Sequence, residues 1–161
     1  CWAGPVRAWS RSALRYNPLV SMLNTAAAAE IRKRLASLRD PVRLVVFSQS
    51  LSAPELCAQN ESLMRELAAL SDRISVEVLN PAIDRERAEA YGIQAVPATV
   101  VEGTRDWGIR FLGVPSGYEF SAFLDAVVVA STGEPALSDE TRQALAGLGQ
   151  DVEIKVFSTP T

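Results

Sequence analysis

The sequence predicts an α/β fold, in which helices flank a mixed central sheet. Short apolar runs that are rich in β-branched residues alternate with longer segments whose apolar residues recur at helical spacing. Two of these runs enclose a helix with short links on either side, which implies a parallel, right-handed crossover. A third run is followed by a glycine-bounded hairpin, so its neighbour is antiparallel. Together these observations predict parallel and antiparallel pairing within one sheet.

The composition limits the location and the partners of the protein. The chain has 161 residues, of which 48% are hydrophobic and 22% are charged, which suits one domain or slightly more. No apolar stretch approaches the ~20 residues of a membrane span, and none resembles a cleavable secretory signal, so we expect a cytoplasmic protein without a membrane partner. The formal net charge is -3, which argues against nucleic acid as a partner.

The chain contains no histidine and only two cysteines, Cys1 and Cys57. This composition excludes Ser-His and Cys-His nucleophile pairs, histidine metal ligands and a closed thiolate zinc site. The two cysteines lie in different segments, and a reducing cytoplasm keeps thiols reduced, so no structural disulfide is expected. We therefore expect thiol chemistry or none, with no metal and no cofactor.

Residues 1–21 form a leader without a regular period. It carries Arg7, Arg11 and Arg15 but no acidic residue, and we expect it to be poorly ordered. Such a leader resembles an organelle transit peptide. However, the chain starts at Cys1, and Met22 would make a natural start, so a cloned or mis-called leader is the favoured interpretation.

The first helix and the first strand follow this leader. An alanine-rich run is capped by Asn24 or Thr25 and ends before Pro41, because a proline is incompatible with the helical turn before it. The run Val42–Phe47 is short, β-branched and bounded by turn residues. It is therefore predicted to be a buried strand.

A small polar loop over residues 48–52 leads from this strand into a helix over residues 53–70. Ser52 and Glu55 have the spacing of a capping box. Pro54 lies in the first turn, where its missing N–H costs nothing. These signals predict that the helix begins directly after Ser52.

Cys57 lies in the first turns of this helix, one position from its apolar face. The residues that recur on that face are Leu56, Leu63, Met64, Leu67 and Leu70. Strand, loop, helix N-terminus and cysteine are the layout of a redox site. The alternative is that Cys57 is a buried, inert small hydrophobic residue. We expect its sulfur to lie beneath the helix start, shielded by Pro54 and Leu56, and to react slowly with thiol reagents.

The next part of the chain is predicted to add a parallel strand, a short charged helix, two antiparallel strands and a closing helix. These elements are Ile74–Leu79, Asp84–Tyr91 with Gly92 as its stop, Ile93–Val101, Ile109–Gly113 after a hairpin loop over Glu102–Gly108, and a helix from near Gly117. Pro97 starts the third strand, where it need not donate a hydrogen bond. On these grounds alone the isomer of the Val96–Pro97 bond stays open.

The last stretch of the chain repeats an earlier one. Shifting Ile31–Ser48 by 110 positions places it on Thr141–Ser158, and eight of the 18 residues coincide without a gap. Ser138 caps a second helix that ends at Gly147, and Val152–Phe157 copies the central strand. We therefore expect a first unit over residues 22–132, a linker over residues 133–137 and the truncated start of a second unit over residues 138–161.

These features resemble the tandem thioredoxin-fold protein disulfide oxidoreductases, also called glutaredoxin-like proteins. The resemblance covers about Met22 to Thr161, and it rests on the element order, the duplication and three motifs. The motifs are Ala95–Thr99, Phe111–Phe120 and Val156–Thr161. The resemblance implies a thioredoxin-like fold for the first unit and, in the second, a C-x-x-C directly after Thr161.

The active-site motif of the first unit departs from this pattern. The register of the helix places Pro54–Cys57 on the C-x-x-C that the family can carry here, so Pro54 replaces the attacking cysteine and Cys57 keeps only the resolving position. A dithiol cycle needs both thiols. A similar loss occurs in the paired thioredoxin-like units at the N-terminus of the flavoprotein that reduces alkyl hydroperoxide reductase, which is a second possible parent.

The resemblance assigns the candidate site residues. Cys57 is the remaining thiol of a degenerate catalytic site, and the active-site loop contains Ser52, Pro54, Glu55 and Leu56. The resemblance also implies a cis bond before Pro97, with the backbone of Val96 pairing with an extended substrate segment as an added strand.

Two classes of function stay open. In the first, the chain is the N-terminal portion of a thiol–disulfide oxidoreductase that acts on protein or peptide thiols and disulfides, with a thioredoxin-reductase-like flavoprotein as a partner. In the second, it is a non-catalytic peptide-binding or docking module. In both, the first unit has a structural or substrate-positioning role.

Overall fold

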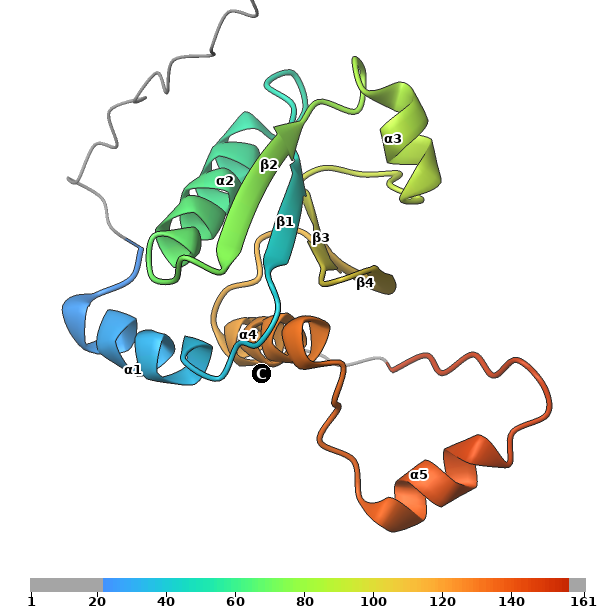
Figure 1. The fold of residues 1–161 in the computed structure, drawn as a ribbon. Coiled ribbons are helices and arrows are strands. Elements are labelled where there is room, and N and C mark those ends of the chain that lie inside the picture. The colour runs from blue at the N-terminus through green and yellow to red at the C-terminus, as the bar shows by residue number, and fades with distance from the viewer. Residues whose placement is uncertain (1–21, 157–161) are drawn as a thin grey trace, which may run out of the picture.

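The computed structural model describes residues 22–156 and contains one four-stranded sheet with helices on both faces (Figure 1). The elements are α1 (Thr25–Leu35), β1 (Val42–Phe47), α2 (Pro54–Ala68), β2 (Ile74–Leu79), α3 (Arg85–Ala90), β3 (Ala98–Glu102), β4 (Asp106–Leu112), α4 (Tyr118–Thr132) and α5 (Asp139–Ala146). The strand order is β2-β1-β3-β4, with β1 and β2 parallel and the other two pairs antiparallel. The predicted mixed sheet and the predicted element order are confirmed.

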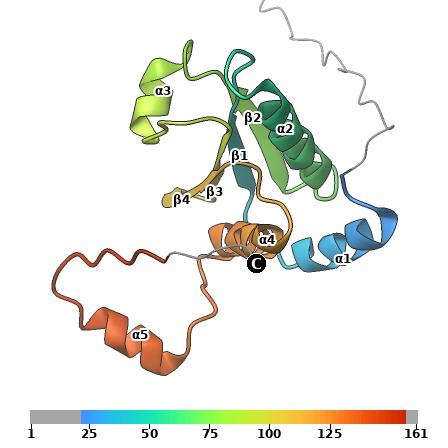
Figure 2. The same cartoon turned by 180° about the vertical axis from the view of Figure 1, so that it is seen from behind.

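The two faces of the sheet bury separate groups of side chains. Helices α1, α2 and α4 pack on one face together with Val42, Leu44 and Val46 of β1. Helix α3 covers part of the opposite face, where Val45 and Phe47 lie (Figure 2). Because β1 is covered on both sides, five of its six residues are buried, which explains its continuous apolar sequence.

Three signals for the start or end of a helix act as predicted. The Asn24 side chain accepts a hydrogen bond from the Ala27 N–H at 2.8 Å and so caps α1. Gly92 has φ +68°, the left-handed conformation that ends a helix, and it follows Tyr91, the C-cap of α3. Helix α4 begins after Gly117, as its position in the sequence predicts.

The hairpin differs from its prediction, because β4 begins at Asp106 rather than at Ile109. Asp106 pairs with Glu102 across an irregularity next to Val101, and the Asp106 carboxylate accepts a hydrogen bond from the Gly108 N–H. The loop is therefore shorter than the predicted one. Strand β3 is also shorter, because residues 93–97 make no strand pairing.

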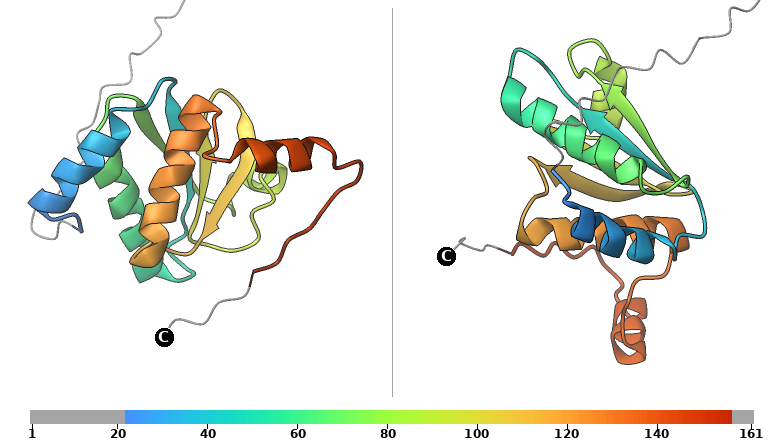
Figure 3. Two further views of the ribbon diagram at one scale, coloured as in Figure 1. Left: turned by 90° about the horizontal axis from the view of Figure 1, so that it is seen from below. Right: turned by 90° about the vertical axis from the view of Figure 1, so that its left-hand side faces the viewer.

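The C-terminal segment forms the predicted helix but not the predicted strand. The Ser138 hydroxyl accepts a hydrogen bond from the Thr141 N–H and caps α5, none of whose residues is buried. Helix α5 projects away from the body formed by the sheet and the other helices (Figure 3). The strand prediction from Val152 is wrong for residues 152–156, because a strand needs a neighbouring backbone and none of the described strands pairs with this segment. Phe157 and the leader over residues 1–21 lie outside the described residues.

A charged network covers the part of the sheet that α3 leaves open. The Arg87 guanidinium donates to both carboxylate oxygens of Glu77, and Arg43 donates to Glu77 and to Glu102. The Tyr91 hydroxyl donates to Glu102 at 2.7 Å. Because these residues come from β1, β2, β3 and α3, the network joins three strands to one helix.

The Glu77–Arg87 pair predicts a dependence of stability on pH. Hydrogen bonds from Arg87, and then its charge and that of Arg43, hold the pKa of Glu77 below its ordinary value of 4.5. A carboxylate with a lowered pKa in the folded state stabilises fully above its unfolded pKa, and this contribution is lost as the pH falls through the folded pKa. The contribution is below about 1 kcal/mol, because the pair is partly exposed and screened by solvent.

We therefore expect the free energy of unfolding of Arg87→Gln to fall less than that of the native chain between about pH 6 and about pH 3. Urea unfolding at several pH values measures this difference. Arg85→Gln is the matched control, because Arg85 is exposed on the same helix. Parallel pH profiles for the native chain and Arg87→Gln would contradict the prediction.

Candidate functional site

The candidate site lies where the carboxyl ends of β1 and β2 meet the amino end of β3. This topology brings together the loop before α2, the loop after β2 and the segment before β3. They surround a shallow hollow of about 170 Å³. The hollow is lined by Gln49, Ser52, Pro81, Ile93, Gln94, Ala95 and Val96. Ser52 and Val96, which the sequence assigns to one site, are thus neighbours.

The start of α2 differs from the predicted capping box. Pro54 is the first helical residue, as predicted, but the N-cap is Ala53, and no side chain caps the helix there. Ala53 has φ +47° and ψ +53°, a conformation that residues other than glycine rarely adopt. In this conformation the chain turns between Ser52 and the helix, so the Ser52 hydroxyl does not cap it. Glu55 lies in the first turn, where its negative charge is favoured.

Cys57 is buried, with 2% of its surface exposed. Its N–H donates to the Ala53 carbonyl at 2.9 Å, and its Sγ donates to the Ser52 carbonyl at 3.5 Å. The predicted burial is therefore confirmed, but Leu56 is 50% exposed and does not lie on the buried face of α2. The buried face instead follows Cys57, because positions 60, 64 and 67 are three, seven and ten residues further along the helix.

Asn60 is a buried polar residue next to the site, and the sequence interpretation missed it. It is fully buried, and its Nδ2 donates to the Thr99 Oγ1 at 2.9 Å. Within the described chain its Oδ1 has no hydrogen-bond partner. This contact ties α2, one turn after Cys57, to β3, two residues after Pro97. The sequence did contain a signal for Asn60. It lies three residues after Cys57 on a helix face that is otherwise apolar, where a polar side chain needs a partner.

The segment before β3 has an open backbone. The Val96–Pro97 peptide bond is cis, and Pro97 is buried. The Pro97 carbonyl accepts a hydrogen bond from the Gly113 N–H at 2.8 Å, which fixes the end of β4 beside it. Val96 is half-buried, and its backbone N–H and carbonyl make no hydrogen bond to another backbone group of residues 22–156. None of the described strands therefore uses the backbone of Val96.

The site holds one thiol and little other chemistry. No group of three or more cysteine, aspartate or glutamate side chains in the described chain has the arrangement of a metal site. Each helix within residues 22–156 is too short or too polar to span a bilayer. Within the part of the chain that the structure describes, the site contains an exposed loop, a backbone segment without a paired strand and a buried sulfur.

A mixed sheet in the order β2-β1-β3-β4, with a helix that starts after β1 and a cis-proline before β3, defines a thioredoxin-like fold. Comparison with solved structures shows the same fold. The NTD_N/C domain of alkylhydroperoxide reductase AhpF from Enterococcus faecalis superposes with a TM-score of 0.71 and 22% identity, over 80% of this chain and 62% of that one. A protein disulfide oxidoreductase from Aeropyrum pernix superposes with a TM-score of 0.67 and 26% identity, over 80% of this chain and 56% of that one.

The sequence is also similar to two curated proteins that are named probable thioredoxins. The protein from Methanothermobacter thermautotrophicus is 44% identical over 55 residues, which are 34% of this chain and 60% of that protein. The protein from Methanothermobacter marburgensis is 40% identical over 57 residues, 35% of this chain and 62% of that protein. The match thus spans about three fifths of each relative. No protein-family model matches the chain.

The burial of Cys57 predicts slow alkylation of the native protein. In a Cys1→Ser chain at neutral pH, we expect iodoacetamide to modify Cys57 at least about a hundredfold more slowly than in the unfolded chain, because the reagent must wait for local opening. Mass spectrometry over time measures the rate. We also expect Cys57→Ala to lower the free energy of unfolding by only about 1 kcal/mol.

The matched control places a thiol at an exposed position of the same helix. Ala58→Cys in a Cys1→Ser, Cys57→Ala chain should be alkylated at close to the unfolded rate, because Ala58 is exposed. Equal rates for the two positions in native protein near pH 6 would show that Cys57 is an accessible thiolate.

Proposed function

We propose that the chain is the N-terminal portion of a cytoplasmic thiol–disulfide oxidoreductase acting on protein disulfides, in which this unit positions a substrate or partner segment and transfers no electrons itself. The observation that carries the proposal is the pairing of an open docking surface with a missing attacking thiol. Pro54 occupies the exposed first position of α2, and Cys57 is buried beneath it. The fold and the similarity to probable thioredoxins support a redox context.

The missing first thiol prevents the usual electron transfer. Attack on a disulfide requires a solvent-accessible thiolate, and a second thiol must then release the mixed disulfide. Pro54 has no sulfur, and the Cys57 Sγ is engaged with the Ser52 carbonyl. Reactive thiols must therefore come from outside residues 22–156, and we place them in a second thioredoxin-like unit that begins near Ser138.

The positioning role rests on the surface around Val96. The N–H and carbonyl of Val96 pair with no other backbone group within residues 22–156, and they would provide the strand edge. Four large apolar side chains are exposed in the loop before α2, the first turn of α2, the loop after β2 and the last residue of β4. They are Leu51, Leu56, Ile83 and Leu112. We expect an extended partner that pairs with Val96 to contact some of these apolar side chains, which would favour partly unfolded or apolar segments.

A second candidate parent is a flavoprotein that reduces a peroxiredoxin. The likeness to the N-terminal domain of alkylhydroperoxide reductase AhpF favours it, because that domain superposes over 80% of this chain. In such a parent the same surface would dock a partner domain rather than a free substrate, and a thioredoxin-reductase-like flavoprotein region would supply the electrons. The third hypothesis is a non-catalytic peptide-binding module, which would use the same docking surface around Val96.

Binding of a thiol-free unfolded peptide tests the positioning role. We expect S-carboxymethylated insulin B chain to shift the backbone amide resonances of Val96 and of the loop before α2 in nuclear magnetic resonance spectra. The double variant Leu51→Glu, Leu56→Glu should weaken binding at least about tenfold, because it removes two apolar contacts and adds two charges. Leu145→Glu on α5 is the control, since Leu145 is about as exposed as Leu56 but lies outside the site.

The two outcomes are distinguishable. Shifts confined to the region around Val96, with loss of affinity in the double variant only, support a positioning unit. Shifts elsewhere on the protein, or an affinity that the double variant leaves unchanged, would overturn it.

A further inference from the structure

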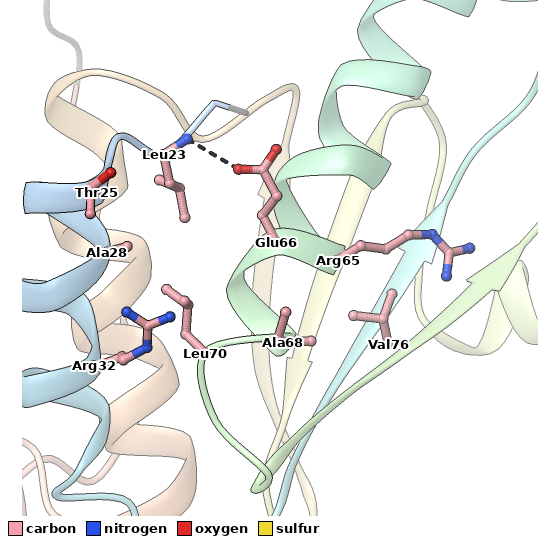
Figure 4. A pocket seen from close by; sticks show the side chains of 10 residues that line it. Leu23, Thr25, Ala28, Arg32, Arg65, Glu66, Ala68, Leu70 and Val76 are labelled. Atoms are coloured by element: carbon pink, nitrogen blue, oxygen red, sulfur yellow. Dashed lines mark hydrogen bonds between the residues drawn. The ribbon is translucent and has the colours of Figure 1, made fainter. Parts of the chain in front are cut away.

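A pocket of about 640 Å³ lies between α1 and α2, at the opposite end of α2 from Cys57 (Figure 4). One wall comes from α1 and the residues just before it, and the other from the last turns of α2 and from β2. The volume falls within the range of about 300–1,000 Å³ that is typical of small-molecule sites. The candidate functional site does not use this pocket.

Small residues keep the pocket open. Ala28 on α1 faces the α2 side, where Ala68 and Ala69 end the helix. Because an alanine side chain ends at Cβ, these residues leave space between the two helices that longer side chains would fill. Leu70 and Val76 are half-buried and add apolar surface to the wall. The body of a bound molecule would therefore be apolar.

The charged side chains that line the pocket differ in whether they already have a partner. The Arg32 side chain reaches from α1 into the space beside Leu70 (Figure 4), and no ion pair joins it to another residue of the described chain. Arg65 instead points away from α1 and donates to Glu61 at 2.7 Å. The carboxylate of Glu66 accepts hydrogen bonds from the Met22 and Leu23 N–H groups at 3.0 and 3.1 Å.

These contacts favour an anionic ligand. Backbone N–H donors partly offset the charge of Glu66, and Arg65 is shared with Glu61, so Arg32 is the charged side chain of the pocket that remains available for a ligand. A guanidinium binds a carboxylate through two parallel hydrogen bonds, and this pairing strengthens when the neighbouring surface is apolar.

We infer that the pocket binds a small amphipathic carboxylate, whose alkyl or aryl body lies against Leu23, Leu70 and Val76 and whose carboxylate pairs with Arg32. The apolar body is held by burial, and the charged end selects an acid over the matching alcohol. This site is independent of the proposed redox function, because it lies at the other end of α2 and involves no thiol.

Decanoate and decanol, titrated separately into the full chain, test the inference. We expect decanoate to shift the amide resonances of Ala28, Ala69, Leu70 and Val76, and to bind more tightly than decanol. Arg32→Gln should weaken decanoate binding about fivefold and leave decanol binding unchanged, since the interaction is a partly exposed ion pair. Lys33→Gln is the matched control, because Lys33 is an exposed neighbour that does not line the pocket.

A second variant tests the cavity itself. Ala69→Phe places a ring at an exposed position of the pocket wall, so we expect the chain to fold and to lose binding of both probes. The inference is overturned if decanoate shifts resonances elsewhere only, if Ala69→Phe leaves its affinity unchanged, or if Arg32→Gln and Lys33→Gln have equal effects.

Discussion

Replacing Pro54 by cysteine is expected to turn a unit with little or no insulin-reducing activity into a dithiol catalyst. Positions 54 and 57 lie three residues apart at the start of α2, so their Cα atoms are within the range of about 4.4–6.8 Å that a disulfide spans. Pro54 is exposed and Cys57 is buried, which is the arrangement of an attacking thiol above a resolving thiol. The new thiol would also lie at the positive end of the helix, where a thiolate is stabilised.

The measurement is insulin precipitation in dithiothreitol, together with mass spectrometry of the 54–57 disulfide. Pro54→Ser tests whether loss of the proline ring alone matters, and Pro54→Cys combined with Cys57→Ala tests the need for the second sulfur. We expect neither control to show dithiol turnover. Robust turnover by the native chain that Cys57→Ser abolishes would contradict the expected inactivity and show that a monothiol route operates.

Phe123→Ala is expected to lower the free energy of unfolding by about 3–5 kcal/mol, the range for removing a buried phenylalanine ring. Phe123 is a residue of α4 and is fully buried in the core between this helix and the sheet. Its ring lies 5.0 Å from the Phe111 ring in an edge-to-face arrangement and 6.5 Å from the Phe120 ring. The substitution removes both contacts and leaves a cavity between α4 and the sheet.

Urea unfolding, followed by circular dichroism, measures this loss. Tyr118→Ala is the matched control on the same helix, because Tyr118 is fully exposed and its removal should change the free energy of unfolding by less than about 0.5 kcal/mol. If Phe123→Ala costs no more than Tyr118→Ala, the described core is not the one that holds the fold together.

The elements that the sequence predicted well are those with strong local signals. Strands Val42–Phe47 and Ile74–Leu79 have the predicted bounds, because an apolar run between turn residues is a local property of the chain. The caps at Asn24 and Ser138 are also local, since each side chain bonds an N–H three residues further on.

The predictions from the sequence were wrong where two local signals competed, or where a strand needed a neighbouring strand to pair with. Ser52 has the spacing of a capping box, but the left-handed conformation of Ala53 moves the cap to the next residue. Leu56 fits the apolar spacing, yet the phase of the helix is set by packing against the sheet, and the buried face follows Cys57 and Asn60. The segment from Val152 has a strand-like sequence without a paired neighbour in the described chain.

The sequence by itself determined the order of elements and the mixed sheet, whereas the family resemblance implied that Ser52 and Val96 lie at one site, where both line the same hollow. That Pro54 stands in place of a first thiol stays a prediction of the resemblance. Only the tertiary structure decided the bond between Asn60 and Thr99 and the pocket between α1 and α2. The reason is that periodicity and caps act over a few residues, whereas these contacts join segments about 40 residues apart, and their distances depend on how helices settle on the sheet.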